Sequence, residues 1–588
     1  METRVQQCLK RLSRLQRPFE RVLLPVILFL WPFVGCGSGV DLTDTMYSLG
    51  NYETLRGGMW YFATFLANVT GRFLMKLPFG SGIAAMQCKA ALLVSITVLI
   101  VYYTLQHLMP GWMIFIGEII AVSLSWGPLV ILYNTLSYLF LTFGVLCLFL
   151  AVTGVPRKRK WYVLAGIFLG LNVFVRFSNL TQAALILAVW FEERIAKRDR
   201  KEAWKDTGAC AGGFALGAGA VFLLICAFYG AGTYFGAVEQ LLHLDGGYTL
   251  PEMLGATAAA YITALKWTFY LAAGMFLGTM FFMMPLLSRV CRIKKVLYLA
   301  GIAVLIRFFY GRGMFTVNYQ DYWCMFEWAM IFILLTVLLD VIFIAGRFAA
   351  TTDERFLAAV SLILILISPL GSNNYTFPIL LNLYVTAPYT LWMFRRIWQE
   401  TRHVRGHSAW HLMAGAVIAM VIVQGILFHC SYSFRDGTDG TARNAVMSGI
   451  PRAEGMHTTP DNARELEQLN RFLQEKGLLE GKVLSMGDIP GISYLYEMEP
   501  AISTAWPDLD SFSAEQFAAD LDALEEPPLV ILKTDPDHAW LKQDQGTADG
   551  EELPVLKKAK LLQEYLDRNS YRTIYESGVY TVKERQSS

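Results

Sequence analysis

Two carboxylates, Asp41 and Asp44, follow directly after the first hydrophobic run of the chain, within the sequence Gly-Val-Asp-Leu-Thr-Asp-Thr-Met-Tyr-Ser-Leu-Gly-Asn at residues 39–51. Acidic residues close to a bilayer tend to be functional, because burying their charge is costly. One of them, with Asp44 favoured over Asp41, is therefore predicted to be a general base or a metal ligand at the membrane–water boundary. The alternative is that both only cap a helix over residues 46–52, where the helix dipole favours negative charge.

The composition indicates what must position this pair. The chain has 588 residues, of which 55% are hydrophobic and 17% charged, and its mean hydropathy is +0.41. This is typical of a polytopic helical membrane protein. Residues 1–430 contain 34 Lys and Arg against 20 Asp and Glu, whereas residues 431–588 contain 16 against 28. We therefore expect a basic transmembrane domain over 1–430 and an acidic soluble domain over 431–588, with no nucleic-acid partner.

Apolar runs predict about thirteen transmembrane helices, of roughly 17–25 residues each, several of them marginal in length. The predicted spans are 22–36, 84–106, 111–130, 135–154, 161–178, 180–193, 207–230, 264–287, 296–311, 322–345, 356–371, 377–394 and 409–430. Basic clusters at 157–160, 194–205, 289–295 and 395–405 fall on the same side as the basic N-terminal segment. The positive-inside rule then puts the N-terminus in the cytoplasm, and the first outer loop (37–82) and the C-terminal domain outside the plasma membrane.

The C-terminal domain is predicted to be a small α/β domain. A helix starts at Thr459-Pro460 and ends near Gly477, because a hydroxyl cap followed by proline starts helices and glycine ends them. Further elements are expected as strands at 482–486 and 529–532, helices at 513–524 and 555–567, and a hairpin of 571–575 with 579–583. The domain has no phosphate loop, nucleophile elbow or metal cluster, and the nine cysteines of the chain have no CxxC spacing. A recognition or scaffold role is therefore expected for it.

Three arginines near the outer ends of predicted spans are candidates for binding a phosphate: Arg176, Arg307 and Arg312. The alternative is that their side chains only reach for the outer lipid headgroups. The candidates for substrate binding are Tyr47, Asn51, Asn179, Asn373 and Asn374. For the last two, the alternative is a turn rich in glycine and asparagine.

Five further acidic or histidine residues are given less weight. Glu239, His243 and Asp245 are expected in a solvated loop helix, and Glu118 and Asp340 are expected to make hydrogen bonds between transmembrane helices.

A first span with its N-terminus inside, followed by an outer loop that opens with Asp-Leu-Thr-Asp and Tyr-Ser-Leu-Gly-Asn-Tyr, resembles the GT-C glycosyltransferase superfamily. Protein mannosyltransferases, aminoarabinose transferases and oligosaccharyltransferase catalytic subunits belong to it. The similarity covers the architecture of the whole chain, but among residues it is confined to the first outer loop. Many members have Asp-Glu or Asp-x-Asp there, so the spacing in this chain leaves open which Asp is catalytic and whether Mg²⁺ or Mn²⁺ binds.

The resemblance implies an inverting transfer of a sugar from a polyprenyl-phosphate donor to a glycan, protein or lipid acceptor, within membrane lipids that solvate the bundle. Asp44 would be the base, and the three arginines would stabilise the departing phosphate. Two other functions remain open: a transporter or flippase for a lipid-linked or polar substrate, and a non-catalytic membrane scaffold. A transporter would place its ionisable groups near the membrane midplane, whereas here they gather at the outer rim.

Overall fold

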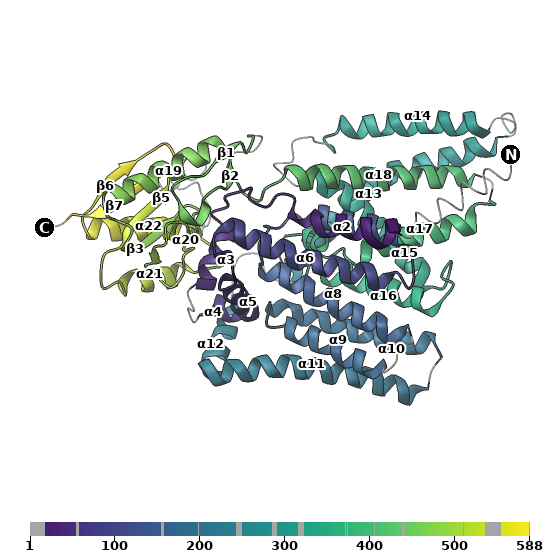
Figure 1. Ribbon diagram of the computed structural model, residues 1–588, viewed down its shortest axis with the longest axis horizontal. Coiled ribbons are helices and arrows are strands. Elements are labelled where there is room, and N and C mark those ends of the chain that lie inside the picture. The colour runs from purple at the N-terminus through teal and green to yellow at the C-terminus, as the bar shows by residue number, and fades with distance from the viewer. Residues whose placement is uncertain are drawn as a thin grey trace.

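The protein consists of a helical bundle and a smaller domain that contains a sheet, joined at the end of α18 (His407–Ser431) (Figure 1). The computed structural model describes residues 18–53, 58–153, 158–197, 199–242, 250–284, 291–314, 323–370, 372, 374–404, 406–437, 441–509, 511–535 and 554–586.

The bundle is built almost wholly from helices. Its first elements are η1 (Phe19–Leu23), α2 (Leu24–Leu30), η2 (Trp31–Phe33), α3 (Asp44–Glu53), α4 (Met59–Ala63), α5 (Phe65–Met75), α6 (Ile83–Leu105), α7 (Gly111–Ser123), α8 (Tyr133–Val152) and α9 (Lys158–Asn172). They are followed by η3 (Phe177–Ala184), α10 (Leu185–Ile195), α11 (Arg200–Tyr229), α12 (Ala231–Leu242), α13 (Leu250–Met283), α14 (Cys291–Tyr310), α15 (Trp323–Ile344), α16 (Thr352–Ile367), η5 (Phe377–Leu381) and α17 (Thr386–Thr401).

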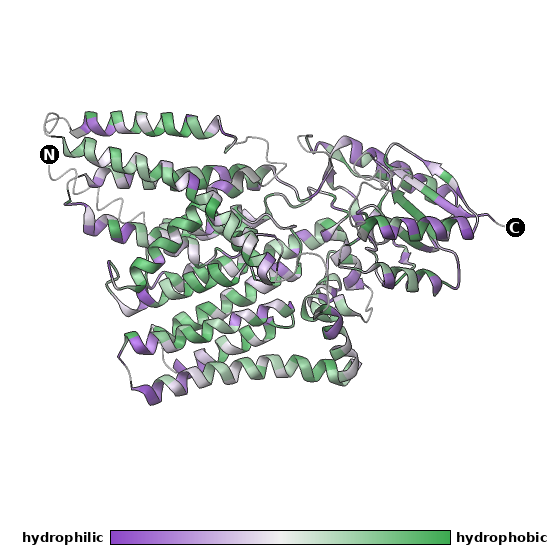
Figure 2. Cartoon of the chain, turned by 180° about the vertical axis from the view of Figure 1, so that it is seen from behind, coloured by the Kyte–Doolittle hydropathy of each residue, from purple (hydrophilic) through white to green (hydrophobic). Residues whose placement is uncertain are grey.

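Helical structure lies within every predicted span, with changed bounds. Six of the described helices are long and apolar enough to cross a membrane, namely α6, α8, α11, α13, α15 and α18. In Figure 2 apolar residues dominate the bundle, and hydrophilic residues collect at the helix ends far from the C-terminal domain. The number of crossings stays a prediction.

Two predicted spans are interrupted. The span predicted at 111–130 keeps its helix only to Ser123, and irregular chain follows to Leu132. Gly127 and Pro128 lie in this irregular stretch, and proline supplies no N–H to a helix. The span predicted at 377–394 begins with η5, and its α-helix starts only at Thr386. Both interruptions supply side chains to the site described below.

The helices α9 and α11 pack closely through glycines. Gly166 and Gly170 lie on α9, and Gly213 and Gly217 lie on α11, so each helix carries a pair with Gly-x-x-x-Gly spacing. A Cβ added at Gly213 would lie 2.1 Å from the carbonyl oxygen of Val163 on α9. Small residues of this spacing let the backbones of membrane helices approach closely.

The C-terminal domain has a five-stranded sheet in the order β4-β3-β5-β7-β6. Its strands are β3 (Lys482–Met486), β4 (Glu499–Pro500), β5 (Leu529–Lys533), β6 (Tyr571–Glu576) and β7 (Tyr580–Arg585). β3 runs parallel to β4 and β5, whereas β7 is antiparallel to β5 and β6.

The remaining elements of this domain are α19 (Pro460–Glu475), α20 (Ile492–Leu495), α21 (Ala514–Asp522), α22 (Pro554–Arg568), the short 3-10 helix η6 (Pro451–Ala453) and the short pair β1 (Ala445–Val446) and β2 (His457–Thr458). The predicted helices, strands and hairpin are confirmed within a few residues. The Thr459 side chain accepts a hydrogen bond from the backbone N–H of Asn462, as expected for a cap. The β1–β2 pair was not predicted.

One hydrophobic cluster joins the two parts of the protein. Met46 and Leu49 of α3 and Met86 of α6 belong to the same buried cluster as Leu466 of α19 and Ile492 of α20. The helix α3 therefore lies between the bundle and the C-terminal domain, as Figure 1 shows. Burial of such side chains stabilises this arrangement by about 1.5–3 kcal/mol each.

The packing of α9 on α11 predicts different outcomes at two adjacent glycines. Gly213→Ala places a methyl group against the α9 backbone and should lower the free energy of unfolding by about 1–3 kcal/mol. Gly212→Ala is the matched control, because a Cβ at Gly212 meets nothing within 4 Å. Thermal unfolding of the purified protein in detergent measures both. Equal midpoints for the two variants would contradict the close packing.

Candidate functional site

The segment 34–43, which leads into α3, is held against α6 by one glutamine. The Gln87 side chain accepts a hydrogen bond from the N–H of Gly37 at 2.7 Å and donates one to the carbonyl of Ser38 at 3.1 Å. Gly39 has a φ of +91°, and a Cβ added there would lie 3.0 Å from the Cβ of Ser433, just after α18. Glycine is thus required at this position both by the backbone conformation and by the close approach.

The C-terminal domain holds the same segment from the other side. The N–H of Gly39 donates to the carbonyl of His457 at 2.9 Å, and the N–H of His457 donates to the carbonyl of Gly37 at 2.7 Å. A third bond of 2.7 Å joins the N–H of Gly491 to the carbonyl of Leu42. The start of α3 is therefore fixed by backbone hydrogen bonds to the soluble domain, each contributing about 1 kcal/mol.

Asp41 caps the start of α3. Its Oδ1 accepts hydrogen bonds from the N–H and hydroxyl of Thr43, at 2.8 and 2.5 Å, and its Oδ2 accepts one of 2.8 Å from the N–H of Thr45. The residue is 3% exposed. Burial raises the pKa of Asp41, while the bonds from Thr43 and Thr45 lower it. Both of its oxygens are already committed to the helix start.

Asp44 has different surroundings. Its side chain is 37% exposed, and its Oδ2 lies 3.9 Å from Nη1 of Arg435. Loss of solvation within the site is the main cause that raises the pKa of Asp44 to about 6. The charge of Asp41 and, less strongly, that of Asp488 also raise this pKa, whereas Arg435 lowers it. A carboxylate with this pKa is ionised at neutral pH and is basic enough to accept a proton.

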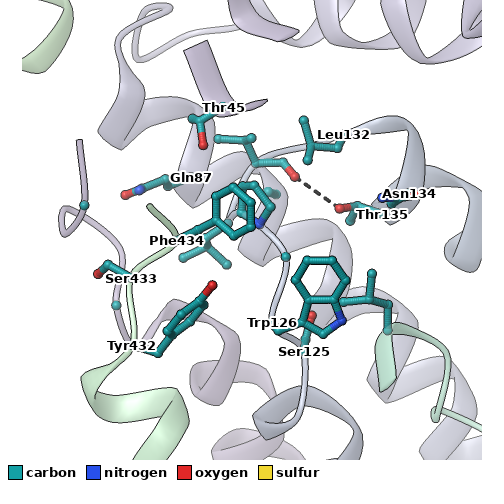
Figure 3. Close-up of a pocket in the computed structure, with 18 of the residues that line it drawn as sticks. Thr45, Gln87, Ser125, Trp126, Leu132, Asn134, Thr135, Tyr432, Ser433 and Phe434 are labelled. Carbon is teal, nitrogen blue, oxygen red and sulfur yellow. Dashed lines mark hydrogen bonds between the residues drawn. The ribbon is translucent and has the colours of Figure 1, made fainter. Parts of the chain in front are cut away.

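Asp44 lines a cavity of about 190 Å³, which we call the Asp44 cavity. Its walls come from segment 32–45, from the first half of α6, from segment 122–138 and from residues 428–435, together with Asn374, Leu381 and Tyr384. Figure 3 shows Tyr432, Ser433 and Phe434 from the chain just after α18, with Trp126 from the irregular segment and Asn134 from α8, around this space.

The lining combines charged and apolar side chains. Asp44 and Arg435 place opposite charges on the wall, whereas Val94, Val122 and Phe428 contribute apolar surface from α6, α7 and α18. The cavity can therefore hold a ligand with both a polar, charged group and an apolar chain.

Arg176 lies against the wall of the Asp44 cavity. Its Nη1 donates to the Asn134 side chain at 3.1 Å, and its guanidinium lies 5.2 Å from the centre of the Tyr133 ring. Tyr133 and Asn134 both line the Asp44 cavity, while Arg176 lines a smaller adjoining one. Asn179 lines the smaller cavity too, and its amide donates to Ser137 at 2.6 Å. The structure thus brings Arg176 close to Asp44's cavity, and it ties Asn179 into a network between helices.

The other predicted site residues are distributed as follows. Asn374 lines the Asp44 cavity, and Asn373 lies outside the described residues. Tyr47 and Asn51 line a separate cavity farther along α3. Arg307 and Arg312 are exposed on and just after α14 and lie over the rings of Tyr310 and Phe308. Among the described residues, neither arginine lines any of these three cavities.

Among the described residues, the acidic side chains that were given less weight do not line the Asp44 cavity. Glu239 lies on α12, while His243 and Asp245 are outside the described residues. Glu118 and Asp340 are fully buried in α7 and α15. The expected hydrogen bond between helices is not found for Glu118 among the described residues.

The carboxylate pair does not by itself form a divalent-cation site. Mg²⁺ and Mn²⁺ need several oxygen ligands. The oxygens of Asp41 already accept three hydrogen bonds from threonines, which leaves Asp44 as the open carboxylate of the pair. In the described part of the chain, no group of three or more His, Cys, Asp and Glu residues is placed to hold a metal ion.

Sequence reasoning missed Arg435, the cation next to Asp44. A signal was available, because Arg435 is a basic residue just beyond the last predicted span, on the side assigned to the first outer loop. It also missed Trp126, which was assigned to a continuous helix. The Gly127-Pro128 pair was the signal there, since such pairs mark turns.

The sequence and the fold of the chain can be compared with those of known proteins. Searches of protein-family models and of curated proteins found no match. Among solved structures, the apo form of the Archaeoglobus fulgidus oligosaccharyltransferase is similar, with a TM-score of 0.49 and 13% identity, over 95% of this chain and 80% of that one. Two further structures of that enzyme each have a TM-score of 0.47 and 14% identity.

The first of these two is a complex with Zn and sulfate, matched over 96% of this chain and 73% of that one. The second is of the protein AglB with an inhibitory peptide and a dolichol-phosphate, matched over 95% and 80%. All three are structures of an oligosaccharyltransferase.

The charge balance around Asp44 predicts how it titrates. A carbodiimide reacts with protonated carboxyl groups, so its labelling of Asp44 should rise as the pH falls through about 6. Arg435→Gln removes a cation that favours the ionised form, and it should move the labelling midpoint to higher pH. Mass spectrometry of labelled peptides measures both.

Arg464→Gln is the control, because Arg464 pairs with the exposed Asp461 far along the chain in α19. A midpoint for Asp44 near pH 4, or one that Arg435→Gln leaves unchanged, would contradict the described surroundings.

Proposed function

We propose that the protein is an integral-membrane glycosyltransferase that moves a sugar from a polyprenyl-phosphate donor to an acceptor, with Asp44 as the general base. The observation that carries the proposal is the Asp44 cavity itself. It places an open carboxylate of raised pKa beside a guanidinium, within a space walled partly by polar side chains such as Gln87 and Asn134 and partly by aromatic and apolar ones.

The two charged groups fit the two chemical needs of the transfer. The acceptor oxygen or nitrogen attacks the anomeric carbon, and its proton passes to the carboxylate of Asp44. The bond between the anomeric carbon and the phosphate oxygen breaks, and that phosphate takes the electron pair. Arg435 lies where it can stabilise the added negative charge, as preorganised cations do. Attack from the side opposite to the leaving phosphate inverts the anomeric configuration.

The apolar wall fits the lipid of the donor. Val94, Val122 and Phe428 lie on helices of the bundle, so an isoprenoid chain leaving the cavity would pass between apolar helices. Arg176 adds a second positive charge behind Tyr133 and Asn134 and would raise the local potential for a phosphate. The part of Arg307 and Arg312 in donor binding stays a prediction.

The same arrangement indicates on which side of the membrane the transfer takes place. The Asp44 cavity lies at the end of the bundle that faces the C-terminal domain. With the basic clusters on the opposite side of the membrane, transfer takes place at the outer face. A metal ion has no step in this mechanism.

Ion-coupled transport is the second candidate. The observation in its favour is Glu118, whose carboxylate is fully buried in α7 and makes no hydrogen bond among the described residues. Buried acids within membrane helices mark proton and ion paths in transporters. Under the glycosyltransferase proposal, Glu118→Gln retains transfer activity.

The experiment is a donor-turnover assay on the full-length protein in nanodiscs with a panel of polyprenyl-phosphate sugars. Asp44→Asn should lower donor turnover by about 10²–10⁴-fold, because it removes the general base. Arg435→Gln should lower it as well and shift its pH profile. Asp461→Asn and Arg464→Gln are matched controls that exchange exposed charged residues in α19. Turnover that Asp44→Asn leaves unchanged would contradict the proposal.

A further inference from the structure

A second cavity, of about 260 Å³, lies between α3 and the C-terminal domain. We call it the Tyr47 cavity. One wall is the face of α3 with Tyr47, Asn51 and Glu53, and the opposite wall is the segment 490–505 around α20 and β4. The cavity therefore exists only because the soluble domain is docked on the first outer loop.

The Tyr47 cavity follows the Asp44 cavity along α3, because Asp44 and Thr45 line one and the next two residues, Met46 and Tyr47, line the other. Residues 44, 47 and 51 are spaced so that they share one face of a helix. Burial is the main cause of the raised pKa of Tyr47, and the nearby charge of Asp44 adds to it. Trp506 packs edge-on against Tyr47 at 5.4 Å between ring centres and donates to the carboxylate of Asp488 at 3.2 Å. A ligand in the Tyr47 cavity would thus lie beside the proposed base.

The lining carries groups that bind sugars. Tyr47 and Tyr494 offer ring surface, Asn51 offers an amide, and Ser493 and Ser503 offer hydroxyl groups. Precisely placed polar groups within such a pocket orient a ligand, and aromatic rings give it contact area.

The charge of the lining is negative. Glu53, Glu497 and Glu499 face one cation, Arg452, among the described lining residues. Arg452 already pairs with Glu53 at 2.6 Å and with Glu497 at 2.8 Å, and it lies over the ring of Tyr494. A phosphate or carboxylate ligand would be repelled here, whereas an amine would be attracted.

We propose that the Tyr47 cavity binds the acceptor, and that this acceptor is a neutral or amine-bearing glycan with no anionic groups at the bound residues. The proposal rests on the glycosyl transfer proposed above. The bound glycan extends one hydroxyl group along α3 toward Asp44, while the donor phosphate occupies the Asp44 cavity beside Arg435. The acceptor and the donor thus approach the base from two separate cavities.

The first test is direct binding of oligosaccharides to the full-length protein in nanodiscs, measured by isothermal titration calorimetry. The probes are chitotetraose (neutral), the fully deacetylated tetramer (cationic) and tetragalacturonate (anionic). We expect the first two to bind and the third to bind at least tenfold more weakly. Binding of tetragalacturonate as tight as that of the others, or binding of none of the three, would overturn the proposal.

Two variants test whether the glycan binds in the Tyr47 cavity. Asn51→Ala should weaken chitotetraose at least fivefold, with Gln474→Ala on the exposed face of α19 as the control. Glu499→Gln should weaken the cationic tetramer more than the neutral one, with the exposed Glu480→Gln as its control. Equal affinities in a variant and its control would overturn the assignment of the glycan to this cavity.

Donor turnover separates this proposal from the function on which it rests. If turnover depends on Asp44 but Asn51→Ala leaves glycan binding unchanged, the glycosyltransferase stands and the acceptor cavity is wrong. If no donor is turned over while glycans bind as expected, the glycosyltransferase fails, and the cavity is no acceptor site.

Discussion

The segment 34–43 and the helix α3 that follows it are held both by the bundle and by the C-terminal domain, and the rest of the site depends on this constraint. Gln87 of α6 binds the backbone of this segment from the bundle, and His457 and Gly491 bind it from the C-terminal domain. A Cβ at Gly491 would lie 2.5 Å from the Cβ of Met46, so the backbone of the C-terminal domain packs directly against α3 at this point. Without the soluble domain, α3 would lose one of its supports and the Tyr47 cavity would lose a wall.

This constraint gives two neighbouring carboxylates different roles. Asp41 lies at the point where the held segment turns into α3, and its oxygens accept hydrogen bonds from N–H groups that a helix start leaves unpaired. Asp44 is three residues further on, at the first residue of α3, and its side chain faces Arg435. The first carboxylate therefore orients the helix, and the second is left open to a ligand. The charge of Asp41 also helps to raise the pKa of Asp44.

Local signals predicted the fold well, and long-range contacts account for what was missed in the site. Thr459 and Pro460 start α19 as expected, because a cap is a property of adjacent residues. Asp-Leu-Thr-Asp is equally compatible with a cap and a base, and only the donors of Thr43 and Thr45 separate the two. The sequence indicates only that Arg435 lies on the same side of the membrane as Asp44; it does not indicate their contact, because the two are about 390 residues apart.

The measurement that tests the account most directly is a cryo-EM structure of the protein with a non-cleavable phosphonate analogue of a polyprenyl-phosphate sugar. The account predicts phosphonate density between Arg435 and the side of the cavity near Arg176, with the sugar beside Asp44 and the lipid along α6, α7 and α18. Phosphonate density on α14 near Arg307 and Arg312, with Asp44 away from the sugar, would contradict it.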